Sequence, residues 1–190
     1  MNLSLFLIII SFIWFSSEVV LARVKHSKTN RSSKQLDQSS LRLLWITITF
    51  SVSIGVFLAM QNLSSLKIQS PFISVLGLGL ILSGLAIRWI AIITLKRYFT
   101  VDVAVLKDQK IVKEGIYKFI RHPAYAGSLL SFLGLGLAFA NWLVFLIIFF
   151  PILAAFIYRM GIEEKALKDF LGNEYIHYSQ TTKRLIPKIY

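Results

Sequence analysis

Uncharged apolar stretches of membrane-spanning length are the feature that most constrains the fold of this chain. The longest covers residues 123–158 and contains no formally charged side chain in 36 residues. As one helix it would be about 54 Å long, whereas the hydrocarbon core of a bilayer is about 30 Å thick. We therefore predict that it turns back at Asn141, the polar break near its middle, to give helices over roughly 124–140 and 142–160.

Three further stretches are long enough to cross a bilayer. The first covers residues 1–22 and contains one charged residue, Glu18. The second, 43–66, contains none, and the third, 68–95, contains only Arg88. The first lacks a basic start and a small-residue cleavage site, so we predict a retained anchor and five crossings in all. Because Arg88 is near the end of its stretch, we expect its side chain to extend to the membrane surface.

The basic residues predict the orientation of the helices. The formal charge is +12, and the Lys and Arg side chains are concentrated in segments 23–42, 96–121 and the tail from Arg159, whereas the loop between the second and third stretches has only Lys67. Basic loops stay inside, so we expect the N-terminus outside, with the polar segments and C-terminus cytoplasmic. Aromatic and basic residues do not interleave on a polar surface, which argues against nucleic acid as a partner.

The residue inventory excludes several kinds of chemistry. Hydrophobic residues make up 56% of the chain, charged residues only 16%, and cysteine is absent. Disulfides, thiolate metal sites and cysteine nucleophiles are therefore excluded, and no nucleophile elbow is present. Gly127, Ser131 and Gly134 share one helix face, which favours close helix packing over a phosphate-binding turn. Three histidines are scattered without metal-ligand spacing: His26, His122 and His177.

Two polar groups on successive helices are candidates for a binding site. His122 and Pro123 begin one helix, where free N–H groups can receive a polar ligand, although an ordinary helix start with interfacial anchors is the alternative. Arg159 and Glu163 are four residues apart and share a face of the next helix, where a surface ion pair is the alternative. An antiparallel hairpin brings the two groups together, so we predict one interfacial pocket that also includes Tyr125.

Residues 162–178 predict an amphipathic helix at the membrane interface. Ile162, Ala166, Phe170 and Leu171 lie on one side with charges opposite. We expect the helix to be broken or capped near Gly172.

Two segments carry a resemblance to a known family. GIYKFIRHPAYAG, followed one hairpin later by RMGIEEKALKDFLGNEYIHYSQTTKRLIP, resembles the isoprenylcysteine carboxyl methyltransferase family and its phospholipid methyltransferase relatives. The resemblance covers about residues 95–187. It implies an all-α integral membrane fold of about five helices, a cytoplasmic cofactor-binding loop and a C-terminal amphipathic interfacial helix. We expect one structural domain, with residues 1–95 forming the first three helices and 96–190 the remainder.

The family also implies a cofactor, S-adenosyl-L-methionine, with S-adenosyl-L-homocysteine as the product. Arg159 matches the family's substrate-contacting arginine, to which we assign the catalytic role. The implied acceptor is the C-terminal carboxylate of a prenylated cysteine or a similar isoprenoid-bearing lipid, reached from membrane lipid. The motif assigns cofactor contacts to eight residues: Ile111, Val112, Tyr117, His122, Pro123, Ala124, Tyr125 and Glu163.

The residue types fit this chemistry and leave two alternatives. A carboxylate acceptor has a pKa near about 3.5 and is already ionised, so methyl transfer needs no general base. An amine acceptor, as in phospholipid N-methylation, would need a base and an anionic pocket, whereas Arg159 favours a carboxylate. A small non-enzymatic membrane protein, such as a transporter subunit, is the other alternative, but transport would predict ionisable residues near the bilayer midplane.

Overall fold

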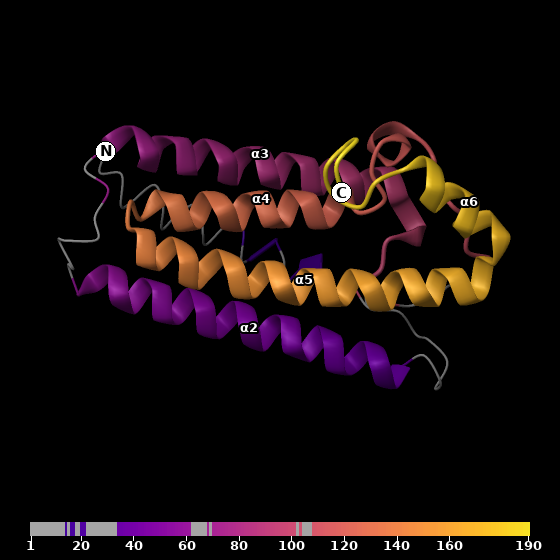
Figure 1. Cartoon of the computed structure of the whole chain (residues 1–190), viewed down its shortest axis with the longest axis horizontal. Coiled ribbons are helices and arrows are strands. Elements are labelled where there is room, and N and C mark those ends of the chain that lie inside the picture. Colours follow the sequence, from indigo (N-terminus) through magenta and orange to yellow (C-terminus); the bar gives the residue numbers. More distant parts are fainter. Residues whose placement is uncertain are drawn as a thin grey trace.

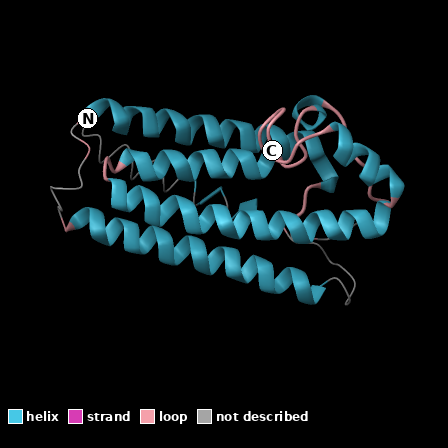
Figure 2. Ribbon diagram, in the orientation of Figure 1, coloured by secondary structure: helices cyan, strands magenta, loops and turns pink. Residues whose placement is uncertain are grey.

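The computed structural model describes residues 14, 16–17, 20–21, 34–61, 68, 70–101, 103 and 108–190. Within these ranges every regular element is a helix, so the all-α prediction is confirmed (Figure 2). The four long helices are α2 (Lys34–Met60), α3 (Pro71–Leu95), α4 (Pro123–Ala138) and α5 (Trp142–Leu171). The short ones are η2 (Lys96–Tyr98), η3 (Gly115–Lys118) and α6 (Asn173–Thr181).

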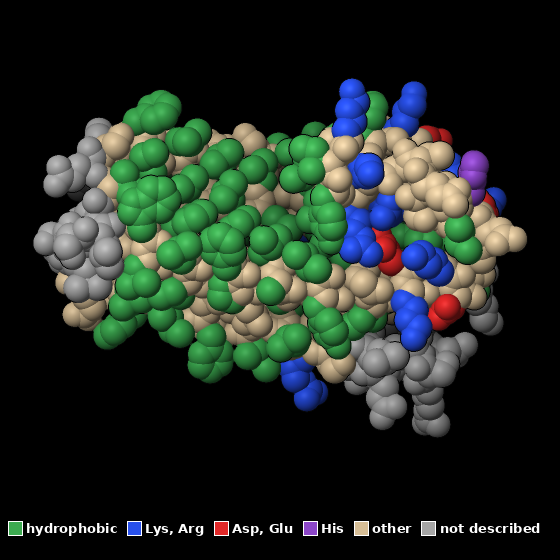
Figure 3. All heavy atoms as spheres, in the orientation of Figure 1, with side chains coloured by type: hydrophobic (Ala, Val, Ile, Leu, Met, Phe, Trp, Pro, Cys, Tyr) green, Lys and Arg blue, Asp and Glu red, His purple; other side chains and the backbone are tan. Residues whose placement is uncertain are grey.

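The long helices lie side by side in the order α2, α5, α4 and α3 (Figure 1). Three of them contain apolar spans long enough to cross a membrane, namely Ser39–Met60, Phe72–Tyr98 and Trp142–Leu171, whereas α4 is shorter. Hydrophobic side chains cover the helical body, and the charged side chains gather at one end (Figure 3). The prediction of an integral membrane protein is confirmed, while the expected first crossing, 1–22, lies largely outside the described residues.

The predicted reversal at Asn141 is confirmed. α4 ends at Ala138 and α5 begins at Trp142. The Asn141 side chain, only 4% exposed, accepts hydrogen bonds from the backbone N–H groups of Leu143 at 3.0 Å and Val144 at 3.2 Å. Asparagine therefore caps α5 at a helix end that would otherwise leave these donors unsatisfied.

Close packing of α3 against α4 depends on small residues, as predicted for the face of Gly127 and Gly134. A Cβ atom on Gly127 would lie 2.6 Å from the Gly84 carbonyl oxygen, and one on Gly77 would lie 2.6 Å from the Gly134 carbonyl oxygen. The backbones of the two helices are thus in direct contact, and Ser131 donates across the interface to the Ile81 carbonyl at 3.2 Å. This contact fixes where α4 begins relative to the end of α3.

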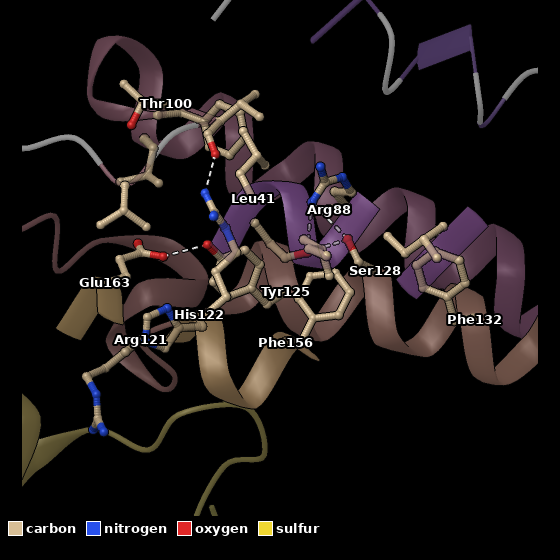
Figure 4. A pocket seen from close by; sticks show the side chains of 18 of the residues that line it. Leu41, Arg88, Thr100, Arg121, His122, Tyr125, Ser128, Phe132, Phe156 and Glu163 are labelled. Atoms are coloured by element: carbon tan, nitrogen blue, oxygen red, sulfur yellow. Dashed lines mark hydrogen bonds between the residues drawn. The ribbon is translucent and has the colours of Figure 1, made fainter. Parts of the chain in front are cut away.

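Arg88 does not extend to the membrane surface, and that expectation is wrong. The residue is only 9% exposed. Its Nη1 donates to Ser128 Oγ at 2.8 Å and to the Ala124 carbonyl at 3.3 Å, because the small residues of α4 leave room and acceptors beside α3 (Figure 4). A guanidinium is therefore held inside the bundle.

The predicted boundary between helix 142–160 and an interfacial helix from 162 is also wrong. α5 continues without a break to Leu171 because no residue between 160 and 171 stops a helix; a single glycine, Gly161, is tolerated. The break comes at Gly172, as expected, where φ is +55° and the chain turns into α6. α5 is thus about 45 Å long and carries Arg159 and Glu163 on one continuous helix.

Candidate active site

A cavity of about 1120 Å³ opens among α2, α4, α5, α6 and the loop before α4. Along α4 its wall passes from His122 and Tyr125 through Ser128 to Phe132 (Figure 4). We call the part around the start of α4 the polar end, lined by Gln109, Tyr117, His122, Arg159, Glu163 and Tyr175. The part further along the helices is the apolar end, lined by Leu44, Ile48, Val52, Phe132, Leu135 and Ala138.

The start of α4 and the end of α5 meet at Tyr125 and Glu163. The Tyr125 hydroxyl donates to Glu163 Oε2 at 2.6 Å. The Tyr125 ring stacks on His122, with centroids 5.5 Å apart and planes 16° apart, and its centroid is 5.3 Å from that of the tilted Phe156 ring. These contacts fix an acidic side chain at the polar end, next to the first turn of α4 (Figure 4).

Arg159 is held rigidly although it lines the cavity. The residue is 1% exposed. Its Nη1 donates to Ser40 Oγ on α2 at 2.9 Å, and its Nη2 donates to the Val101 carbonyl at 2.6 Å. A guanidinium has five N–H donors in one plane, so these two bonds orient the plane of the Arg159 side chain within the cavity wall.

Glu164, which the sequence analysis did not select, is the centre of a buried ion cluster. It is 3% exposed, and its carboxylate accepts from Arg121 Nε at 3.0 Å, His122 Nε2 at 3.2 Å and Arg184 Nη2 at 2.7 Å. We call these four residues the Glu164 cluster. The hydrogen bonds that Arg184 donates to Glu164 raise the pKa of the Arg184 guanidinium above its ordinary value. The cluster binds the loop before α4, the end of α5 and the C-terminal segment to one another.

The C-terminal segment pairs with the loop that precedes α4. The Arg121 N–H donates to the Lys183 carbonyl at 2.7 Å, and the His122 N–H donates to the Arg184 carbonyl at 3.0 Å, beside a parallel bridge between Ile120 and Lys183. The Arg121 guanidinium also donates to the carbonyls of Ser179, at 2.9 Å, and Thr182. The backbone at the polar end is therefore held by residues about 60 positions further along the chain.

Three buried tyrosines, Tyr117, Tyr175 and Tyr178, line the cavity. Tyr178 donates to the Tyr117 carbonyl at 2.7 Å, and burial raises the pKa of Tyr178 to about 12. Tyr117 in turn has its hydroxyl 3.4 Å from the Ala91 carbonyl. Tyr175 is 2% exposed, and its hydroxyl has no hydrogen-bond partner among the described residues.

The structure brings almost all of the predicted site residues to this cavity. Pro123 is the exception: it is fully buried at the first position of α4 and does not line the cavity. His122 lines it, but its Nε2 is engaged by Glu164. The others all contribute to the lining: Ile111, Val112, Tyr117, Ala124, Tyr125, Arg159 and Glu163.

Sequence reasoning missed Arg88, Glu164, Tyr175 and Arg184. The adjacency of two glutamates, 163 and 164, on a helix that continues past the apolar stretch was one available signal, because neighbouring helix positions face different directions. No periodic pattern in the sequence predicts the path of the C-terminal segment that contains Arg184.

Fold and cavity together define a class: a helical integral membrane protein with a cavity that joins a polar end to an apolar end. Residues 76–169 match the sequence profile of the isoprenylcysteine carboxyl methyltransferase (ICMT) family. Protein-S-isoprenylcysteine O-methyltransferase B of Arabidopsis thaliana is 32% identical over 187 residues, which cover 96% of this chain and 91% of that protein. The chain belongs to the isoprenylcysteine carboxyl methyltransferase family, and the predictions of this family and of a methyltransferase are confirmed.

Other relatives agree with this assignment. The probable protein-S-isoprenylcysteine O-methyltransferase of Oryza sativa subsp. indica is 29% identical over 93% of this chain and 92% of its own length. The solved structure of the eukaryotic intramembrane Ras methyltransferase ICMT is 25% identical, superimposes with a TM-score of 0.61 and covers 85% of this chain. The chain spans 55% of the length of that solved protein.

Proposed function

We propose that this protein transfers a methyl group from S-adenosylmethionine to the C-terminal carboxylate of a prenylated cysteine, or of a similar isoprenoid-bearing lipid, at the cytoplasmic face of the membrane. The single observation that carries the proposal is the continuity of the cavity from its polar to its apolar end. A polar ligand group matches one end, and an apolar chain matches the other. The names of the relatives, protein-S-isoprenylcysteine O-methyltransferases, support this acceptor.

The residues at the polar end fit the cofactor. Glu163 accepts one hydrogen bond from Tyr125, and a carboxylate has about four lone-pair sites, so it can also accept from an ammonium group. Ile111 and Val112 are half-buried, line the same cavity and offer an apolar wall for a purine. The volume of about 1120 Å³ exceeds the roughly 300–1,000 Å³ of a site for one drug-sized molecule, which leaves room for a second ligand.

In this proposal the protein positions its ligands rather than moving protons. When bound, S-adenosylmethionine supplies a sulfonium methyl group, which an acceptor carboxylate oxygen takes as the carbon–sulfur bond breaks, giving a methyl ester and S-adenosylhomocysteine. Arg159, already oriented by Ser40 and Val101, binds the acceptor carboxylate with its planar guanidinium. Glu163 holds the ammonium group one helical turn away. The apolar rings of Phe132 and Phe156 line the cavity and help to exclude water from the space where the methyl donor and the acceptor meet.

The cytoplasmic orientation rests on charge. The end of the bundle that holds the polar end also carries the exposed basic side chains of η2, of the loop before α4 and of the last part of α5 (Figure 3). Basic segments remain on the cytoplasmic side of a membrane. The polar cofactor then reaches the cavity from the cytoplasm, and the acceptor lipid reaches it from the bilayer.

A methyl-transfer assay with purified protein in detergent tests the proposal. S-farnesylcysteine, S-methylcysteine and phosphatidylethanolamine are each incubated with radiolabelled S-adenosylmethionine, and the labelled product is treated with base. We expect a base-labile methyl ester on S-farnesylcysteine alone. Base-stable label on phosphatidylethanolamine would instead support amine methylation, and equal labelling of S-methylcysteine would contradict the use of the apolar end.

A further inference from the structure

One face of α2 lines the cavity along most of the length of the helix. The lining residues of α2 recur every three or four positions, which is the spacing of a single stripe on an α-helix. α4 lines the cavity with a similar stripe from His122 to Phe139, and α5 lies between the two helices (Figure 1). The apolar end is therefore elongated along α2 and α4. The stripe on α2 includes Leu41, Trp45, Ile48, Val52, Val56 and Met60.

The polar end gives the α2 stripe a fixed starting point. Ser40 directly precedes the stripe, and its Oγ accepts a hydrogen bond from Arg159 Nη1 at 2.9 Å. Depth along α2 can thus be counted from the Arg159 guanidinium, with a rise of about 1.5 Å for each residue. On this scale Val52 lies about 18 Å beyond Ser40, and Val56 lies about 24 Å beyond it.

The side chains at these two depths are apolar and accessible. Val56 is 38% exposed, while Val52 is half-buried and packs against the apolar core. Both line the cavity, so an apolar chain that extends from Arg159 along α2 passes next to them. Such a chain comes from a bilayer whose acyl chains are as apolar as the cavity wall, so its transfer brings little free energy. Steric fit then decides which chains are accepted.

The repeat of a prenyl chain is close to one turn of α2. An isoprene unit places four carbon–carbon bonds along the chain, which is about 5 Å when extended, and one helical turn rises about 5.4 Å. The carboxylate carbon of a prenylcysteine is about 4 Å from its sulfur. An extended farnesyl chain then ends about 19 Å from the carboxylate, and a geranylgeranyl chain ends about 24 Å from it. These lengths match the depths of Val52 and Val56.

We propose that α2 sets which prenyl chains the cavity accepts, with Val52 beside the third isoprene unit and Val56 beside the fourth. The inference rests on the proposed function, in which Arg159 binds the acceptor carboxylate. Each turn of α2 contacts one isoprene unit, so the cavity accommodates all four units of a geranylgeranyl chain as well as the three of a farnesyl chain.

Methyl transfer to acceptors of three chain lengths tests the proposal on the whole protein in detergent. The acceptors are N-acetylcysteines with an S-geranyl, S-farnesyl or S-geranylgeranyl group. The wild type should methylate the farnesyl and geranylgeranyl acceptors with KM values within about threefold of each other. Val56→Trp should lower kcat/KM about tenfold for the geranylgeranyl acceptor alone, the usual effect of overpacking a filled site. Val52→Trp should lower it similarly for the farnesyl and geranylgeranyl acceptors and spare the geranyl acceptor.

Ile54→Trp is the matched control. Ile54 is two residues from each valine, so it lies on the other side of α2, and it is 45% exposed. The added indole ring should leave kcat/KM for all three acceptors unchanged. Calorimetric titration with S-adenosylhomocysteine should give the wild-type affinity in all three variants, because the substitutions are far from the polar end.

The other outcomes overturn the proposal in different ways. Equal losses for all three acceptors, or weakened S-adenosylhomocysteine binding, would show that the two valines serve the fold rather than the prenyl chain. No loss in either valine variant would show that the chain leaves the cavity for the bilayer before it reaches Val52. Failure of the wild type to accept the geranylgeranyl chain would refute the match of lengths. A wild type that methylates none of the three acceptors would overturn the proposed function itself.

Discussion

Replacing Glu164 with glutamine should destabilise the protein even though Glu164 is outside the predicted set of site residues. Glutamine has the same size and keeps one acceptor oxygen, but it removes the negative charge that faces two arginines. The side chains of Arg121 and Glu164 are 10% and 4% exposed, so their contact is poorly screened, whereas Arg184 is 31% exposed and its contribution is smaller. Removing one member of a buried ion pair costs about 3–5 kcal/mol, and the partial exposure of Arg184 favours about 3.

The expected loss is large enough to measure in detergent. For a chain of this size, about 1 kcal/mol lowers the melting temperature by about 2–4 °C, so Glu164→Gln should lower it by about 6–12 °C. Size-exclusion chromatography after heating measures the fraction that stays folded. Glu174→Gln is the matched control, because the Lys113–Glu174 pair is 3.9 Å apart with both side chains more than half exposed, and it should change little. Equal shifts in the two variants would refute the reasoning about burial.

Three further predictions concern the binding site and its supports. Arg159→Ala should lower methyl transfer about 100-fold or more while largely sparing S-adenosylhomocysteine binding, and Glu163→Ala should weaken that binding; equal activity in the two variants would contradict the assigned roles. Gly127→Leu should prevent normal packing of α3 against α4 and lower the yield of monodisperse protein, because its Cβ would already lie 2.6 Å from a backbone oxygen. Tyr178→Phe should lower unfolding free energy by about 1 kcal/mol, measured by thermal unfolding, since it leaves the Tyr117 carbonyl without its donor.

The parts of the site that could be predicted from sequence are those set by local geometry. An uncharged stretch too long for one crossing must turn, and Asn141 is a residue that can cap the second helix, so the hairpin followed directly. Once the hairpin is antiparallel, the start of α4 and the end of α5 must be neighbours. The contact between Tyr125 and Glu163 is a consequence of that arrangement.

The parts that could not be predicted depend on contacts between distant segments. Glu164 receives Arg121 from 43 positions away and Arg184 from 20 positions away, and neither separation leaves a periodic signal. The prediction for Arg88 is wrong because its position near the end of an apolar stretch suggests that the side chain reaches the membrane surface. Ser128 on α4 instead provides a hydrogen-bond acceptor for it inside the bundle. The hydroxyl of Tyr175 is unusual only for a missing partner, which a sequence cannot reveal.

The unbroken course of α5 sets a limit on changes in chain length. Arg159 and Glu163 face the same cavity because four residues make slightly more than one turn of a helix. A single residue inserted between them would rotate everything beyond it by about 100° and carry Glu163 and Glu164 away from their partners. Substitutions at 160–162 that keep the helix leave the interval intact, whereas a deletion or insertion of one codon there would separate the two halves of the pocket.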